Sequence, residues 1–142
     1  MTDRITLAQA NTIIEAAFAK GKELGLKPLS IVVVDAGGHV QAFQRADGAS
    51  SMRLGIALGK AAGALALGVS SRKIGEMAAE RPAFIAAASG IAPSGIIPAA
   101  GGIIVKGGDG FAIGAVGITG DTSDNDEICA LAGIAAAGLT AA

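Results

Sequence analysis

Residues 30–48 read SIVVVDAGGHVQAFQRADG, and this stretch has the form of a β-hairpin. An apolar, β-branched run at 30–35 is followed by paired glycines and then by a run at 40–45 in which apolar and polar residues alternate. Two such runs joined by a glycine turn are typical of paired antiparallel strands. The first run has no polar interruption, which predicts a strand covered on both faces.

The turn of this hairpin holds the only histidine of the chain, His39. Gly37 and Gly38 can adopt backbone conformations closed to other residues and let a partner approach closely. We therefore expect His39 and Asp35 to flank an accessible corner, where the imidazole could act as a general acid or base or as a metal ligand. The alternative is a turn histidine that points to solvent or bonds to a neighbouring loop.

Helices and a second hairpin are predicted around the first. The apolar spacing and the capping residues predict helices over 6–25, about 51–68, 71–80 and 126–139, with a further turn at 83–89. Strands at 103–106 and 111–118 flank a second glycine-rich turn. This order favours an α+β sandwich, an antiparallel sheet of two hairpins covered by helices, in a single domain of residues 1–142.

The composition argues against several classes of protein. Of 142 residues, 51% are hydrophobic and 16% charged, with a formal net charge of −1, so no basic surface for nucleic acid is predicted. A single cysteine cannot form an internal disulfide. The longest weakly charged stretch, 54–69, is shorter than the roughly 20 apolar residues of a membrane span. The start of the chain has no secretory signal, so we expect a cytoplasmic protein without a membrane partner.

Two features predict a homo-oligomer. Gly55, Gly59 and Gly63 recur at intervals of four in the second helix, so another backbone could pack closely on that face. The glycine-rich loop 90–102 is expected to be an ordered lid or interface. It contains apolar side chains that a monomer would cover poorly, namely Ile91, Ile96 and Ile97.

Lys60 is the only charged residue between Arg53 and Arg72, in a helix that is otherwise apolar. Either its ammonium extends to the edge of the helix, or it is held for an anion or for chemistry, because a desolvated lysine has a lowered pKa. Arg45 and Asp47 form either a solvated pair at a strand end or, with Lys60, a pocket for a carboxylate.

The last predicted helix begins with Asp126 and Glu127, which are expected to serve as first-turn charges. Glu127 is also a candidate general base. Cys129 lies on an apolar face of this helix and is predicted to be a buried thiol rather than a nucleophile. A structural zinc site is not expected, because one cysteine and one histidine cannot complete four ligands without carboxylates.

The chain resembles the GlcG/HbpS family over nearly its whole length. The resemblance rests on the order and spacing of short motifs, namely Val34-Asp35-Ala36-Gly37-Gly38-His39, Arg45-Ala46-Asp47-Gly48-Ala49, Lys60-Ala61, Gly101-Gly102, Gly114-Ala115-Val116-Gly117-Ile118-Thr119-Gly120 and Asp126-Glu127. It implies an oligomer with a helix-covered antiparallel sheet. Some members bind haem, and others are encoded among enzymes of small-acid or diol metabolism without an agreed activity.

For this chain the resemblance implies haem as a candidate cofactor, with His39 as a candidate ligand of the iron. Two departures from the family bear on this. Haem-binding relatives place a ligating histidine in the first helix, and this chain has none between Thr6 and Gly25. A proline that commonly follows the paired glycines is replaced by Ile104. The other side chains that could bind haem iron are Cys129, Met52 and Met77.

Three functions remain open. In the first, a pocket between subunits, lined by His39, Lys60 and the loop 90–102, binds a small anionic ligand or haem. Further ligand-binding candidates are Asp35, Gly37, Gly38, Arg45, Gly101 and Gly102. In the second, the protein is a cofactor-free enzyme of lyase or isomerase type, in which Lys60 and Arg45 orient a small organic acid and His39 moves the proton, with Glu127 as a further catalytic candidate. In the third, the protein is an accessory subunit without a ligand. The first two require His39 and Lys60 to face one cavity.

Overall fold

The computed structural model of the chain describes residues 4–142. The expectation about the start of the chain therefore falls partly on residues 1–3, outside the described residues. Helices and strands follow one another in the order α1 (Leu7–Glu23), β1 (Ser30–Asp35), β2 (Val40–Arg45), α2 (Arg53–Leu67), α3 (Ser71–Glu80), α4 (Pro82–Ile91), β3 (Gly102–Lys106), β4 (Ala112–Thr119), α5 (Ser123–Ala136) and β5 (Thr140–Ala141).

Helix ends lie where capping side chains satisfy free backbone groups. At the start of α1 the predicted capping box is present: the Thr6 hydroxyl accepts from the Gln9 amide at 3.1 Å, and the Gln9 side chain accepts from the Thr6 amide at 2.9 Å. α5 begins three residues earlier than predicted, because the hydroxyl of Thr122 accepts from the backbone amide of Asn125 and caps the helix.

The strands form one five-stranded antiparallel sheet in the order β2-β1-β4-β3-β5. β1 joins the two hairpins, since it pairs with β2 on one side and with β4 on the other. β5 is a two-residue strand that extends the sheet beside the end of β3 and has no counterpart in the predicted elements. The predicted α+β fold with an antiparallel sheet of two hairpins is confirmed.

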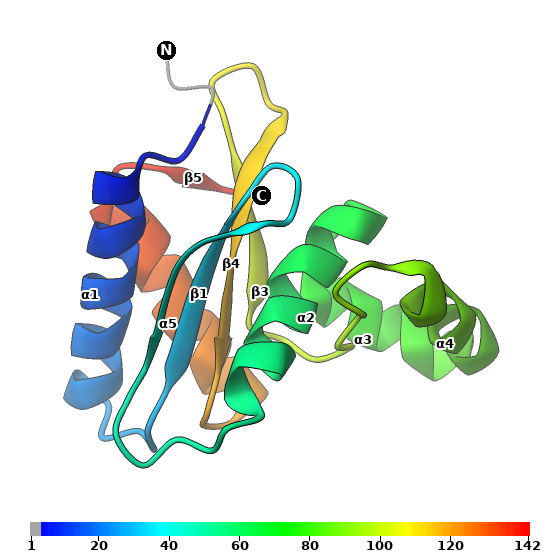
Figure 1. The fold of residues 1–142 in the computed structure, drawn as a ribbon, viewed down its shortest axis with the longest axis horizontal. Helices are drawn as coiled ribbons and strands as arrows, with labels where there is room; N and C mark the ends of the chain where they lie inside the picture. Colours follow the sequence, from blue (N-terminus) through cyan, green and yellow to red (C-terminus); the bar gives the residue numbers. More distant parts are fainter. Residues whose placement is uncertain (1–3) are drawn as a thin grey trace.

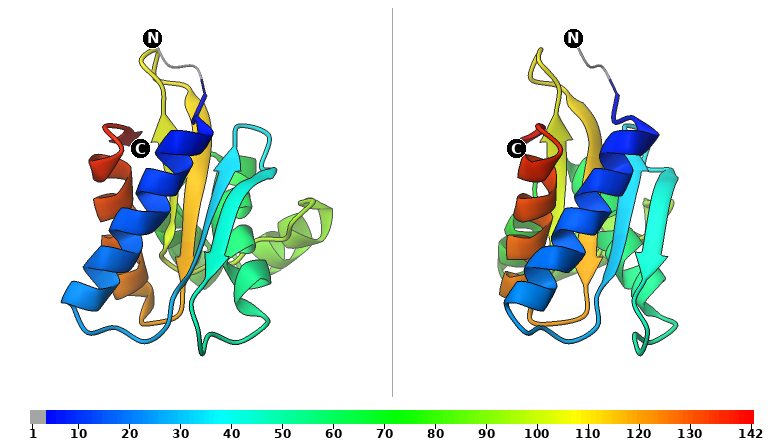
Figure 2. Two further views of the ribbon diagram at one scale, coloured as in Figure 1. Left: turned by 60° about the vertical axis from the view of Figure 1, so that its left-hand side comes forward. Right: turned by 90° about the vertical axis from the view of Figure 1, so that its left-hand side faces the viewer.

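Helices cover both faces of the sheet, α1 and α5 on one face and α2 on the other (Figures 1 and 2). Ile31 and Val33 point into the core beneath α1 and α5, whereas Val32 and Val34 point into the core beneath α2. The uninterrupted apolar run of β1 therefore reflects burial on both faces, as predicted. α3 and α4 extend beyond α2 (Figure 1), and the start of α3 touches the sheet, where the Ser71 hydroxyl accepts the Gly102 amide at 2.7 Å.

Glycines in the sheet bring α2 unusually close to it. A side chain at Gly117 in β4 would collide with the backbone oxygen of Ala57, and one at Gly102 in β3 would collide with that of Lys60. The bare backbone at these two positions lets the helix rest directly on the strands. The small residues of α2 and of the sheet thus allow a close, densely packed contact between the helix and β3 and β4.

Two of the three glycines on the face of α2 that was predicted to be a subunit interface, Gly59 and Gly63, are covered by the chain's own loop between α4 and β3. An added Cβ at Gly59 would lie 2.6 Å from Cγ1 of Ile97, and one at Gly63 would lie 3.1 Å from Cα of Ile96. Ile97 also donates its amide to the Gly59 carbonyl at 3.3 Å. At Gly59 and Gly63 this argument for oligomerisation is therefore corrected, while Gly55 has open space around it and Ile91, at the end of α4, remains 87% exposed.

Within residues 4–142 no single helix has both the length and the apolar character that a membrane crossing needs. α2 and α3 meet that requirement only when taken together, and they are bent by 77° at their junction.

Candidate functional site

The β1–β2 turn is organised by the carboxylate of Asp35. Its Oδ1 accepts the backbone amides of Gly37 at 2.9 Å and of His39 at 3.0 Å. Gly38 takes a positive φ of 82°, which permits the tight bend. The backbone hydrogen bond from His39 is the main reason why the pKa of Asp35 lies below its ordinary value. Asp35 is thus an ionised, hydrogen-bonded anchor for the turn.

The imidazole of His39 is held beside this anchor and remains open to solvent. Its Nδ1 lies 3.3 Å from Oδ1 of Asp35, and the side chain is 82% exposed. A Cβ at Gly37 would lie 2.9 Å from Nδ1, so the glycine leaves room for the ring. A carboxylate beside Nδ1 favours the proton on that nitrogen and leaves Nε2 with a lone pair for a metal or a proton.

His39 stands at a cavity of about 290 Å³ between the turn, α2 and the loop after α4. The walls are small or apolar, and His39 supplies the only ionisable side chain among the lining residues, which are Ala36, Gly37, Gly38, His39, Ala62, Leu65, Ala66, Ala92, Pro93, Ser94 and Gly95. This volume is at the lower end of the range for small-molecule sites, about 300 to 1,000 Å³. The predicted turn residues Gly37, Gly38 and His39 do line one concave site.

Lys60 is not part of this cavity. Lys60 and Ala62 are two positions apart on α2 and therefore project from nearly opposite sides of the helix, and only Ala62 lines the cavity. The Lys60 ammonium instead donates to the carbonyl oxygen of Ile118 at 2.9 Å and to Oδ2 of Asp126 at 3.2 Å. The expectation that His39 and Lys60 face one pocket is therefore corrected.

The Lys60–Asp126 pair is buried between α2, the sheet and α5. The two side chains are 3% and 1% exposed. Loss of hydration is the largest influence on both groups, lowering the pKa of Lys60 and raising that of Asp126, although their mutual attraction opposes each shift. The other carboxylate oxygen of Asp126 accepts the amide of Asp121 at 3.0 Å. The pair has the geometry of a structural link.

Gly101 and Gly102, predicted to bind a ligand, pack on Lys60 instead. A Cβ at Gly101 would lie 3.0 Å from the Lys60 nitrogen. Sequence reasoning predicted only a first-turn helix charge for Asp126, which proves to be the partner of Lys60. The one available signal was the position of Lys60 on an apolar helix, since a buried ammonium needs a counter-charge.

The remaining predicted site residues lie elsewhere. Arg45 is exposed at the far end of β2 from the turn, opposite Ser30 in the sheet register. The two carboxylate oxygens of Glu127 share the single N–H of Arg72 Nε, each at 3.1 Å, and this contact ties α5 to α3. The candidate catalytic residues His39, Lys60 and Glu127 are therefore not gathered in one place.

Among the candidate donors to haem iron, only His39 faces a cavity. Cys129 is fully buried, and burial is the main cause that raises its pKa to about 11, which keeps it a thiol. Met77 packs against the small core between α3 and α4. Met52 is 72% exposed at the start of α2 but does not line the His39 cavity.

Comparison with known proteins finds one matching family model and several solved structures with the same fold. The family model described as "Haem degrading protein HbpS-like" matches residues 5–135. Among curated proteins, none matches the chain. The structure of a PduOC–haem complex superposes with a TM-score of 0.85 at 23% identity, covering 96% of this chain and 97% of that one.

Two further solved structures are similar over nearly their whole length. A double mutant of HbpS from Streptomyces reticuli gives a TM-score of 0.81 at 27% identity, covering 95% of this chain and 88% of that one. The ORFY protein of Klebsiella pneumoniae gives 0.84 at 28% identity, covering 94% and 90%.

Proposed function

This chain belongs to the HbpS-like family, and on that premise we propose that it binds haem through His39 in the cavity beside the β1–β2 turn. The observation that supports this most directly is the arrangement of the only imidazole. Its Nδ1 faces the carboxylate of Asp35 at 3.3 Å, and the ring stands at a cavity with apolar walls. A histidine oriented in this way by a carboxylate is a common ligand arrangement at metal centres.

The donor set and the walls fit a haem that is only partly enclosed. The imidazole of His39 would hold the iron, and Leu65, Ala66 and Pro93 would provide apolar contact for the macrocycle. The cavity of about 290 Å³ is small for a ligand of this size, so one chain would cover only part of it. Bound haem supplies redox-active iron, while these residues bind and orient it.

We also propose a homo-oligomer, as the family resemblance implies, in which a second copy covers the open side of the site. The loop that follows α4 lines the cavity with Ala92 and Pro93, and α4 itself exposes Phe84 by 43% and Ile91 by 87%. No lysine or arginine lines the cavity, so Lys60 and Arg45 have no place in recognising the acid groups of the ligand there. Light scattering should give a multiple of the 13.7 kDa chain mass, and a monomeric mass would refute this part of the proposal.

Titration with haemin tests the haem site. We expect a shifted Soret band for the wild type, its loss in His39→Ala, and a normal band in Met52→Leu, which removes the other exposed candidate donor. Asp35→Asn should weaken binding about 10-fold or more, because it removes a partner that orients a ligand. An unchanged Soret shift in His39→Ala would exclude His39 as the ligand.

The alternative of a cofactor-free enzyme on a small organic acid finds no support in this arrangement. Its three catalytic candidates would have to act on one substrate, yet Lys60 is buried against Asp126 and Glu127 is bonded to Arg72. No specific observation therefore favours this second function.

A further inference from the structure

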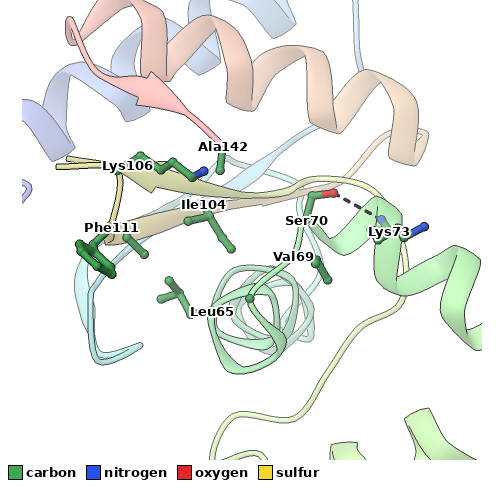
Figure 3. Close-up of a pocket in the computed structure, with 11 residues that line it drawn as sticks. Leu65, Val69, Ser70, Lys73, Ile104, Lys106, Phe111 and Ala142 are labelled. Carbon is green, nitrogen blue, oxygen red and sulfur yellow. Dashed lines mark hydrogen bonds between the residues drawn. The ribbon is translucent and has the colours of Figure 1, made fainter. Parts of the chain in front are cut away.

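A second and larger cavity lies on the other side of Leu65 from the haem site proposed above. It has a volume of about 490 Å³, within the range of small-molecule sites. Its walls come from four parts of the chain: the end of α2, the start of α3, the β3–β4 hairpin, and Ala142 after β5. Figure 3 shows Leu65, Val69, Ile104 and Phe111 arranged around it.

The lining of this cavity is apolar on its walls and basic at its margin. Phe111 is 75% exposed. Leaving a phenyl ring in water is unfavourable, so an exposed ring beside a cavity indicates a surface that a ligand or partner covers. Leu65 and Ile104 form the facing walls, and no aspartate or glutamate lines the cavity. The ionisable side chains among the lining residues are those of Lys73 and Lys106.

The two lysines differ in whether their ammonium groups form an ion pair. The Lys73 ammonium lies 3.6 Å from Oε1 of Glu76 on the same helix, and in Figure 3 it points away from the other labelled residues. Lys106 has no ion pair within residues 4–142, and its ammonium lies toward Ala142 along β3 (Figure 3). Its flexible stem can bring the charge to the mouth of the cavity.

We propose that this cavity binds a small amphipathic carboxylate, with its apolar body against Leu65, Ile104 and Phe111 and its carboxylate on Lys106. Among the side chains that line the site, those of Lys73 and Lys106 are basic and none is acidic, which favours an anion over a cation, and Lys106 is the one without an ion pair among residues 4–142. The site shares only Leu65 with the His39 cavity. The inference therefore does not depend on haem binding.

The probe for this site is 3-phenylpropionate, titrated into the ¹⁵N-labelled full chain and followed by NMR. We expect shifts concentrated at the backbone amides of Val69, Ile104 and Phe111, and weaker binding of the neutral amide of the same acid. Lys106→Gln should reduce affinity about two- to fivefold, as expected for one exposed ion pair. Ala112→Leu, at an exposed position in the lining, should fill the cavity and reduce affinity more than about 10-fold.

Lys22→Gln is the matched control, because it removes an exposed lysine from α1 on the opposite face of the sheet. Melting curves show whether each variant is folded. Shifts centred away from the cavity, equal affinities for Lys106→Gln and Lys22→Gln, or equal affinities for acid and amide would each overturn the proposal. His39→Ala should bind the acid normally, so failure of the haem proposal and failure of this one give different results.

Discussion

Replacing Lys60 by methionine removes the ammonium from a pair that is almost wholly buried, while leaving its apolar stem approximately matched. The Lys60 nitrogen and Asp126 Oδ2 are 3.2 Å apart, which corresponds to about 5 kcal/mol of attraction at an effective dielectric constant of 20. Loss of hydration costs several kcal/mol for each ion, so the intact pair is close to neutral for stability. Breaking it is not neutral, because Asp126 is left buried without a cation.

We therefore expect Lys60→Met to lower the free energy of unfolding at pH 7 by about 3 to 5 kcal/mol, or Tm by about 10 to 20 °C. Adding Asp126→Asn to that variant should recover about 2 kcal/mol, since asparagine carries no charge and keeps an oxygen for the Asp121 amide. The assay is urea unfolding followed by circular dichroism on the wild type, both single variants and the double variant. Lys22→Met controls for loss of an exposed lysine.

The pH dependence gives an independent signature of the same pair. Burial raises the pKa of Asp126 above its ordinary 3.8, and removal of Lys60 removes an opposing influence. A carboxyl with a raised folded-state pKa binds protons more tightly in the folded chain, so its penalty grows as pH rises above the unfolded value. The loss of unfolding free energy in Lys60→Met, relative to the wild type, should thus be smaller at pH 5 than at pH 8. A variant as stable as the wild type, or a coupling energy below about 0.5 kcal/mol, would refute a structural role for the pair.

Two further predictions concern packing and acid stability. Gly117→Ala should cost about 3 kcal/mol or more in unfolding free energy, because its methyl group would meet the Ala57 carbonyl, whereas Gly55→Ala, with open space around it on the same helix as Ala57, should gain about 0.5 to 1 kcal/mol. Equal effects in thermal melts would contradict the close packing of α2. The amide of Asn125 is the main cause that lowers the pKa of Asp121 to about 2 from 3.8. The stabilisation by the ionised Asp121 carboxylate is present above pH 3.8 and is lost as pH falls toward 2. Urea unfolding at pH 5 and at pH 3 should therefore show a smaller drop in unfolding free energy for Asp121→Ala than for the wild type.

The local elements were predictable because their determinants lie within a few residues of one another. The capping box at Thr6 and the hairpin turn at Gly37 and Gly38 depend only on neighbouring residues, and the structure has helix and turn at those places. Boundaries moved where a second capping residue competed, as at Thr122. The exposed corner around His39 also followed from local turn chemistry, since Asp35 bonds residues two and four positions ahead.

The candidate site was only half predictable. The sequence identified His39, Gly37 and Gly38, but the cavity walls at Ala62 and Pro93 come from segments with no local signal of their role. The partner of Lys60 is 66 residues away, and nothing in the spacing distinguishes Asp126 from its neighbour Glu127. The sequence indicated that another backbone could pack closely on the glycines of α2. It did not indicate that this backbone is a loop of the same chain.

The amino-acid sequence by itself determined the types of element, their approximate order and the position of the single imidazole, because hydrophobic period, capping and turn chemistry act over short range. Only the tertiary structure decided that β1 pairs with β4, that Lys60 turns toward Asp126 rather than toward His39, and that a loop of the same chain covers α2 at Gly59 and Gly63. These outcomes depend on which faces of distant elements meet. A helix rotates its side chains by about 100° per residue, so a displacement of two positions separates a cavity wall from a buried charge.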